Sequence, residues 1–335
     1  MTQKNHIKRF LATTISIAVM SIFSVYGQTD ANICHFWSDR SFFNPAYIVP
    51  ATIHGSLVAR SQQIGFKGQP MTAAGNFSLY KPKWRSLIGA QLRYDYAGYT
   101  TTAKADLQYA FSLGSEDDRV NLGLSVGTSY KNYDEREIKA DEMSDAFLYD
   151  YENAFKPNYN FGIEWIHKVN RFSSDQDEFT LGASMLNMED YFSRYENRIT
   201  VNEFYAYSSY RLRTVHNLDF YMGGMGQYYD TNRLQGEIHG SIIKTGRDRG
   251  DLDVIDIWAL GLSYRHNAIG RGSSDMIINA GIAIGPHVYV GYSFDMVVRN
   301  DFGKPFSSHE IFLEYKFKDR DCLADKSNYV LLGGK

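Results

Sequence analysis

Few residue pairs in this chain have the types and spacing that chemistry requires. His309 and Glu310 are adjacent, and a histidine beside a carboxylate could move protons in general acid–base catalysis. Adjacent residues of a β-strand point to opposite faces, however, so these two side chains could not easily share a site. Asp117 and Asp118 fall in an expected turn, which is the ordinary place for aspartate. Neither pair therefore predicts an active site.

Motifs of the common catalytic classes are absent from the sequence. It has no glycine-rich phosphate loop, no GxSxG elbow and no HExxH zinc motif, and its nine histidines are scattered. We therefore expect a protein that is not an enzyme and that has no cofactor and no metal site.

The elements that must position any site are predicted to be β-strands. Val120–Tyr130 reads VNLGLSVGTSY, in which apolar residues alternate with small or polar ones. Only a strand has a side-chain period of two. The alternation returns in fourteen segments of about ten residues, the length at which a tilted strand crosses a membrane. The predicted strands are 53–61, 72–80, 86–96, 101–112, 119–130, 159–167, 178–187, 203–213, 217–229, 234–245, 255–266, 275–285, 287–298 and 308–318.

Charged residues in these segments fall on the face opposite the apolar one. A charge at the bilayer midplane costs about 2–4 kcal/mol, so a lipid-facing wall requires this separation. A water-soluble sheet with one buried face is the alternative, but the even strand count, the uniform strand length and the export signal favour a membrane barrel. Predicted lipid-facing residues include Ile88, Leu92, Tyr94, Leu122, Leu124, Ile311 and Leu313, and predicted lumen-facing residues include Gln91, Arg93, Asp95, Lys104 and Asp106.

The first 27 residues have the pattern of a secretory signal peptide. Lys4, Lys8 and Arg9 precede a mostly apolar run, and small residues near Gly27 suit cleavage before Gln28. A membrane anchor is the alternative. The segment carries three basic and no acidic residues, so cleavage would move the formal net charge from −3 to −6. This charge argues against nucleic acid as a partner, because phosphate binding needs a basic surface.

The expected layout is a single all-β domain between two shorter segments. Residues 1–27 are the signal peptide, 28–52 an N-terminal periplasmic segment, 53–318 a transmembrane antiparallel β-barrel of about 14 strands, and 319–335 a C-terminal periplasmic tail. Cys34 and Cys322 lie near the two ends of the exported chain and lack the paired spacing of a zinc site. Both ends of an even-stranded barrel emerge on the same side, so these cysteines could form a disulfide; two free thiols are the alternative.

The segment before the first strand contains the block Phe43-Asn44-Pro45-Ala46-Tyr47. Proline disfavours helix in the residue before it, so Asn44-Pro45 predicts an extended turn. Disordered segments are poor in aromatics, yet Phe42, Phe43 and Tyr47 occur together here. We expect Cys34–Pro50 to pack into the periplasmic mouth of the barrel as a plug, with a flexible leader as the alternative.

Five short blocks carry a resemblance to a known family. In their order and spacing they are similar to the PorP/SprF family of Bacteroidetes outer-membrane proteins, over Phe43 to Phe317. Two departures exist: Arg60 is followed by Ser-Gln-Gln where the family often has Gln-Trp, and the family's usual pattern has no C-terminal tail. The blocks are FNPAY at Phe43–Tyr47, RSQQIGFKGQP at Arg60–Pro70, YDYAG at Tyr94–Gly98, PHVYVGYSFD at Pro286–Asp295 and SSHEIFLEYKF at Ser307–Phe317.

The resemblance implies a barrel of the type IX secretion and gliding-motility apparatus. Members of the family typically help to secrete or anchor large surface adhesins. They are thought to receive a cargo's C-terminal domain, and some associate with periplasmic ring components of the system. The implied location is the outer membrane, in contact with its lipid.

Two connections on the outer side are the candidates for cargo contact, because binding residues often lie in shaped loops. The first contains Gly65, Phe66, Gly68 and Pro70. The second is the long connection Lys131–Asn158, which contains Tyr149 and Tyr151 and has eight acidic and four basic residues. A solvated loop is the ordinary interpretation of such a charge run.

The sequence leaves two other functions open. A passive channel for small solutes would suit the polar lumen residues. A purely structural or adhesive barrel is the second. An outer-membrane enzyme is more distant still, because the sequence has neither a catalytic triad nor a metal-binding set.

Overall fold

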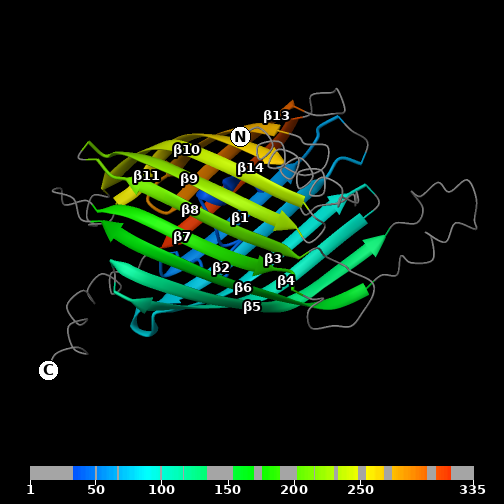
Figure 1. Ribbon diagram of the computed structural model, residues 1–335, viewed down its shortest axis with the longest axis horizontal. Helices are drawn as coiled ribbons and strands as arrows, with labels where there is room; N and C mark the ends of the chain where they lie inside the picture. The colour runs from blue at the N-terminus through cyan, green and yellow to red at the C-terminus, as the bar shows by residue number, and fades with distance from the viewer. Residues whose placement is uncertain are drawn as a thin grey trace, which may run out of the picture.

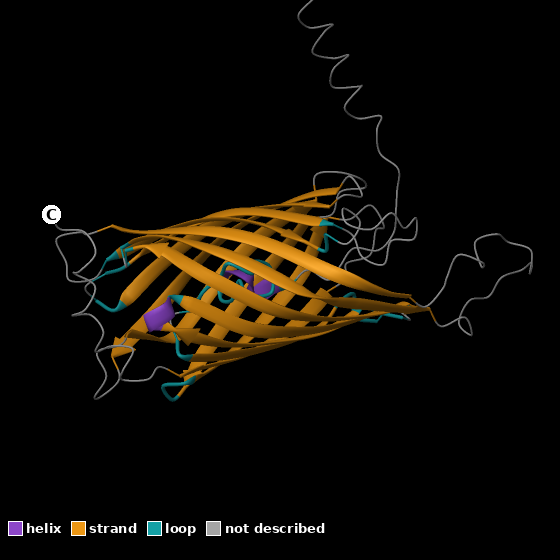
Figure 2. Cartoon of the chain, turned by 90° about the horizontal axis from the view of Figure 1, so that it is seen from below, coloured by secondary structure: helices purple, strands orange, loops and turns teal. Residues whose placement is uncertain are grey.

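Fourteen antiparallel strands form a closed barrel (Figures 1 and 2). Each strand pairs with its sequence neighbours, and β1 pairs with β14 from Ile53 opposite Phe317 to Ser61 opposite His309. A closed sheet has no unpaired edge, which is what strands surrounded by lipid require. The predicted fourteen-stranded all-β barrel is therefore confirmed. The strands are β1 Ile53–Ser61, β2 Met71–Lys81, β3 Ser86–Ala97, β4 Thr100–Gly114, β5 Asp118–Tyr133, β6 Ala154–Val169, β7 Asp177–Leu186, β8 Glu203–Leu212, β9 Leu218–Tyr229, β10 Arg233–Arg247, β11 Val254–Asn267, β12 Ser274–Ile284, β13 Val288–Arg299 and β14 Ser307–Phe317.

The structure is a computed structural model. It describes residues 33–49, 51–65, 68–98, 100–115, 117–133, 154–169, 176–188, 202–214, 216–229, 233–247, 254–267, 274–299 and 307–317. The predicted signal peptide 1–27 and tail 319–335 lie outside these residues. No helix in the described part of the chain is long and apolar enough to cross a bilayer.

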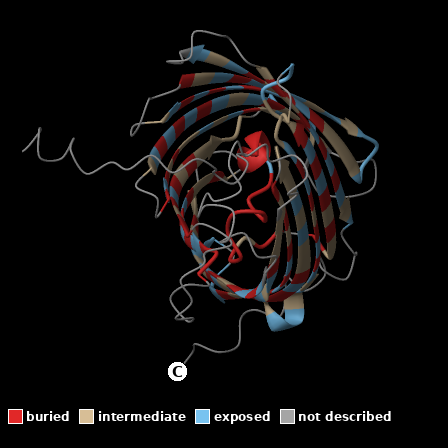
Figure 3. Cartoon of the chain, turned by 90° about the vertical axis from the view of Figure 1, so that its right-hand side faces the viewer, coloured by how far each residue is buried: buried red, intermediate tan, exposed pale blue. Residues whose placement is uncertain are grey.

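The two faces of the wall differ as the alternation predicts. Leu107 is 71% exposed on the outer face, whereas Glu164 and Glu310 are fully buried on the inner face. Figure 3 shows buried and exposed residues alternating along the strands. Apolar side chains outside and charged side chains inside are the arrangement of a barrel in lipid.

The strand β6 is the largest departure from the predicted boundaries. It begins at Ala154 instead of residue 159, and β5 continues to Tyr133, so part of the predicted connection Lys131–Asn158 is strand. Pro157 lies in this added part of the strand, where β6 pairs with β5 alone, since pairing with β7 starts at Phe161. A strand tolerates proline where one side needs no hydrogen bond.

Four of the connections at one end of the barrel are short turns. The turns between β2 and β3, β4 and β5, β8 and β9, and β12 and β13 are short, and they contain left-handed residues such as Gly114 (φ 105°) and Gly285 (φ 73°). The first of these turns is the short helix η2, Pro82–Trp84. This end, which also holds the start of β1, is called the turn end below.

A segment before β1 lies inside the barrel. Residues Ile33–Val49, which we call the plug, begin with the short helix η1, Cys34–Trp37. Figure 3 shows the plug as a buried stretch surrounded by the strands. Within the plug, only Ser38 is exposed and only Tyr47 is half-buried.

Candidate functional site in the barrel lumen

The plug reaches farther than the mouth at which the sequence places it. Cys34 contacts Arg60, the penultimate residue of β1, which lies at the end of the barrel opposite the turn end. The plug then runs back toward the turn end and joins β1 at Ile53. Side chains from strands on both sides of the barrel bind the plug and hold it at this depth.

Glu310 of β14 binds the start of η1. Its carboxylate accepts hydrogen bonds from the backbone N–H groups of Cys34 (2.8 Å) and His35 (2.9 Å), and it lies 2.6 Å from His35 Nδ1. The His35 ring stacks on Phe312, with the ring centroids 4.7 Å apart. His309, the neighbour of Glu310 in sequence, instead contacts Tyr292 and Phe294. The prediction that His309 and Glu310 do not share a site is confirmed.

The thiol of Cys34 lies among buried charges. Arg60 Nη1 donates to Cys34 Sγ at 2.7 Å, and Arg60 Nη2 donates to Asp295 Oδ2 at 2.7 Å. Burial raises the pKa of Cys34 well above its ordinary value, in spite of the neighbouring guanidinium of Arg60. Cys34 is a free cysteine in the structure, and Cys322 lies outside the described residues, so their pairing stays a prediction.

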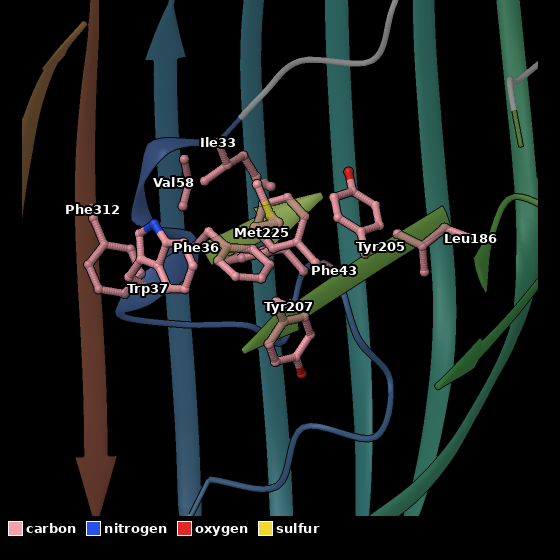
Figure 4. Close-up of a cluster of buried hydrophobic side chains, with 12 residues drawn as sticks. Ile33, Phe36, Trp37, Phe43, Val58, Leu186, Tyr205, Tyr207, Met225 and Phe312 are labelled. Atoms are coloured by element: carbon pink, nitrogen blue, oxygen red, sulfur yellow. The ribbon is translucent and has the colours of Figure 1, made fainter. Parts of the chain in front are cut away.

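A cluster of buried aromatic and aliphatic side chains joins the plug to the surrounding strands (Figure 4). Trp37 donates from Nε1 to Glu237 Oε1 at 2.7 Å and stacks on His239 with centroids 5.3 Å apart. Phe36 meets Phe43 and Tyr207 edge to face, at 5.0 and 5.2 Å between centroids. These rings fill the lumen with apolar surface, whose burial is the main favourable term in packing.

Arg40 and Glu164 form a buried ion pair between the plug and β6. Arg40 Nε donates to Glu164 Oε1 at 3.0 Å, and the hydroxyl of Tyr207 donates to the same oxygen at 2.9 Å. The guanidinium also lies 4.7 Å from the centre of the Tyr47 ring. Burial alone would lower the pKa of Arg40, but the carboxylate of Glu164 together with Tyr221, Tyr207 and Tyr47 outweighs burial and raises that pKa. Removing either partner would leave a buried charge unpaired.

The predicted turn at Asn44-Pro45 lies against the wall. Asn44 Nδ2 donates to the Tyr207 hydroxyl at 2.8 Å, and Asn44 Oδ1 accepts from the backbone N–H of Ala46 at 2.8 Å. Two strand side chains bind plug carbonyls: Gln108 Nε2 donates to Pro45 O at 2.7 Å, and Ser184 Oγ donates to Phe43 O at 2.5 Å. The block Phe43–Tyr47 is thus held by strands on several sides.

Glycines on the inner face let the plug approach the wall. A Cβ atom at any of four wall positions would overlap plug atoms, so no larger residue fits without movement. Glycine in a strand often marks such a close approach of a second backbone. The four glycines, with the plug residues they face, are Gly123 of β5 at Pro45 and Ala46, Gly162 of β6 at Asn44, Gly223 of β9 at Trp37, and Gly291 of β13 at His35.

Asp39, His54 and Glu314 bring three metal-ligating side chains together near the turn end, with their ligand atoms within 4.8 Å of one another. His54 Nε2 lies 3.1 Å from Glu314 Oε1 and 3.7 Å from Asp39 Oδ2. Lys316 Nζ also binds Glu314, at 2.8 Å. His54 and Lys316 are thus the partners of the two carboxylates, and the three contacts form one ion-pair network. Burial alone would raise the pKa of Asp39, but His54 and hydrogen bonds outweigh it and lower that pKa.

Little space remains between the plug and the wall beside Asn44. The cavity there is about 10 Å³ and is lined by residues that include Ser41, Pro45 and Gln108. A cavity of this size holds about one water molecule.

The predicted cargo-contact residues are partly described. Gly65 and Gly68 have left-handed backbone (φ 94° and 77°), and Gly98 N–H donates to Gly68 O at 3.1 Å. Ile64 N–H donates to Ser307 O at 3.0 Å, which ties this connection to β14. Pro70 directly precedes β2, and its carbonyl accepts from Gln62 N–H at 2.8 Å. Phe66, Tyr149 and Tyr151 lie outside the described residues.

Comparison with known proteins identifies the family. The family described as "Type IX secretion system membrane protein PorP/SprF" matches residues 25–315 of this chain. The chain belongs to the PorP/SprF family. It is therefore an outer-membrane protein of a family of type IX secretion components. No curated protein sequence matches it.

Solved outer-membrane barrels are similar to this PorP/SprF protein in fold alone. The CymD monoaromatic hydrocarbon channel has a TM-score of 0.47 and 8% identity, covering 83% of this chain and 92% of that one. Omp33 from Acinetobacter baumannii has a TM-score of 0.41 and 10% identity, covering 80% and 98%. CdiB from Acinetobacter baumannii has a TM-score of 0.41 and 7% identity over 79% of this chain, which spans only 60% of the length of CdiB.

Sequence reasoning missed most of the residues that bind the plug. His35, Trp37 and Arg40 have no recognisable spacing relative to their strand partners. Alternation does place Glu164 and Glu310 on the lumen face, and two carboxylates inside a barrel need a cation or several donors. These two inward-facing carboxylates were therefore the feature of the sequence that predicts a basic or N–H-rich segment in the lumen.

Proposed function

We propose that this PorP/SprF protein helps the type IX secretion system to secrete an exported adhesin or other cargo, or to attach it to the cell surface. The match of the family over residues 25–315 carries this proposal. The proposed partners are the C-terminal domain of the cargo, the periplasmic ring components of the system and outer-membrane lipid. A role in gliding motility belongs to the same proposal.

The proposed cargo contact is the end of the barrel opposite the turn end. There the connection between β1 and β2 is exposed at Gly65 and held in shape by the bonds of Ile64 to Ser307 of β14 and of Gly68 to Gly98. Phe66, Pro70, Tyr149 and Tyr151 complete the proposed contact set. The test replaces the connection between β1 and β2 and the connection between β5 and β6 by short glycine–serine loops. If cargo attachment were unchanged, this assignment would fail.

A passive channel for small solutes is the second candidate, and the plug inside the lumen argues against it. The polar residues that would line a channel already have partners: Gln91 binds Ser41 O of the plug, and Arg93 binds Asp95 at 2.7 Å. Lys104 binds Asn187, and Asn158 binds Asp106. A steady, large conductance of the purified protein in planar bilayers would favour the channel.

A deletion strain of the native host tests the main proposal. We expect loss of at least one cargo from the cell surface and the culture medium, restored by the gene on a plasmid. A deletion strain that still displays all its surface adhesins would favour a purely structural barrel instead. Pull-down from solubilised outer membranes would identify the partners.

A further inference from the structure

We infer that the plug stays seated while cargo is handled, so that cargo binds the outside of a closed barrel and does not pass through its lumen. This inference rests on the proposed function, since it concerns the route of the same cargo. The lumen then serves to hold the plug, and the partner surface consists of the connections and the outer wall.

Contacts from opposite walls hold the plug at once. Glu310 of β14 binds its start, Glu237 of β10 binds Trp37, and Glu164 of β6 binds Arg40. Gln108 of β4 and Ser184 of β7 bind carbonyls of the plug. Moving the plug along the barrel axis would break bonds to all of these strands together. A partial displacement, which leaves some buried charges unpaired, would be the most costly state.

The glycines of the inner face match the plug in shape. Gly123, Gly162, Gly223 and Gly291 come from four different strands, and each faces a different part of the plug. A segment that entered the lumen only briefly would not need four positions without side chains. Close packing of this kind is sensitive to displacements of less than a side chain.

The link between the plug and the wall is short. Val49 lies four residues before Ile53, so this stretch could span at most about 14 Å when fully extended. Ala51 N–H donates to Val49 O at 2.8 Å, and Tyr80 N–H donates to Thr52 O at 3.0 Å, which fixes the link beside β2. The plug therefore has little slack with which to swing out of the lumen at the turn end.

A disulfide between plug and wall tests the inference directly. A Cβ atom at position 162 would lie 3.0 Å from Asn44 Cγ, an atom whose place a cysteine sulfur can take. The sulfur of a cysteine at position 162 could then bond to the sulfur at position 44, because the S–S bond of a disulfide is about 2.05 Å long. The locked variant combines Asn44→Cys and Gly162→Cys in a background that carries Cys34→Ser and Cys322→Ser. The disulfide between positions 44 and 162, which we call the lock, forms in the oxidising periplasm. The matched controls are the background, the Asn44→Cys single variant and the double variant kept reduced with dithiothreitol; Gly162→Cys alone is no control, because its Cβ would overlap Asn44 Oδ1.

We expect the locked barrel to secrete and display cargo at the level of its background, within about twofold. A loss of tenfold or more, with normal barrel abundance and normal secretion by Asn44→Cys and by the reduced double variant, would overturn the inference. If the deletion strain itself retained all cargo, the proposed function would fail instead, so the two failures are distinguishable.

Labelling of the Asn44→Cys single variant gives a second readout that does not require the lock to form. A membrane-impermeant maleimide is added to living cells during secretion, with Ile64→Cys, 46% exposed, as the accessible control. We expect Ile64→Cys to be labelled and Asn44→Cys to stay unlabelled. Labelling of Asn44→Cys at a comparable rate would overturn the inference, because it would mean that the plug leaves its site.

Discussion

The inner and outer faces of the same strand place different demands on their residues. In β14, Ile311 and Leu313 lie on the outer face and are 58% and 40% exposed. Their inner-face neighbours are Glu310, which binds η1, and Phe312, which stacks on His35. An outer-face residue needs only to be apolar, because lipid tails adapt to its shape. An inner-face residue must match one particular partner in charge and shape.

The residues that must match one particular partner therefore lie on the inner face of this barrel. Outer-face substitutions that remain apolar should cost little, because packing against lipid is not unique. Inner-face substitutions should destabilise the protein more, by an amount that depends on the charge pairing or the packing that each one removes.

Arg40→Ala should lower the free energy of unfolding by about 3–5 kcal/mol, because it leaves the fully buried carboxylate of Glu164 without its cation. Urea unfolding of the barrel in lipid vesicles measures the change. The double variant Arg40→Ala with Glu164→Gln removes both charges and should recover most of the loss. A double variant as unstable as the single one would mean that the ion pair is not the source.

On the outer face, Leu107→Lys should cost about 2–4 kcal/mol, since a charge would face lipid near the middle of β4. The apolar change Leu107→Met should cost close to nothing, and the same urea measurement compares the two. If lysine were tolerated as well as methionine, this face would not lie in the hydrocarbon.

Gly123→Leu should destabilise the seated plug by about 1–3 kcal/mol, because the new side chain would overlap the backbone of Pro45 and Ala46. The matched control is Gly240→Leu, where a Cβ meets no atom within 4 Å. Limited proteolysis reports the position of the plug. Cleavage around Phe42–Tyr47 should be slow in the wild type and in Gly240→Leu, and faster in Gly123→Leu. Rapid cleavage of the wild type would argue against a packed plug.

The smallest expected effect is a pH dependence from Asp39. Its folded-state pKa is lowered, so its contribution to stability is complete above the ordinary aspartate pKa of about 3.9 and is lost as the pH falls through the lower folded value. Acid unfolding of Asp39→Asn should therefore be less steep below about pH 4 than that of the wild type. Identical slopes would assign the acid sensitivity to other carboxylates.

Strand positions were largely predictable, because alternation is a local property of the chain. The predicted strand 203–213 differs by one residue from β8, Glu203–Leu212. The prediction was wrong at the start of β6, which begins at Ala154 instead of residue 159 and so includes Pro157. Whether a proline breaks a strand depends on which side of the strand is paired, and neighbouring strands decide that.

The candidate site was less predictable than the wall. The aromatics of Phe42–Tyr47 indicated that the N-terminal segment packs somewhere, and the expected location was the barrel. Its partners could not be named, because Arg40 and Glu164 are 124 residues apart and Cys34 and Glu310 are 276 apart. No local pattern links residues at such separations.

The sequence by itself determined the class of fold, the membrane-facing surface and the family. These follow from a period of two, from the placement of charges and from short blocks in a fixed order. Only the tertiary structure decided that the N-terminal segment runs through the lumen and which wall residues hold it there. The reason is physical: alternation specifies which face a side chain is on, whereas complementarity across the lumen arises only when the sheet closes and brings distant strands around one segment.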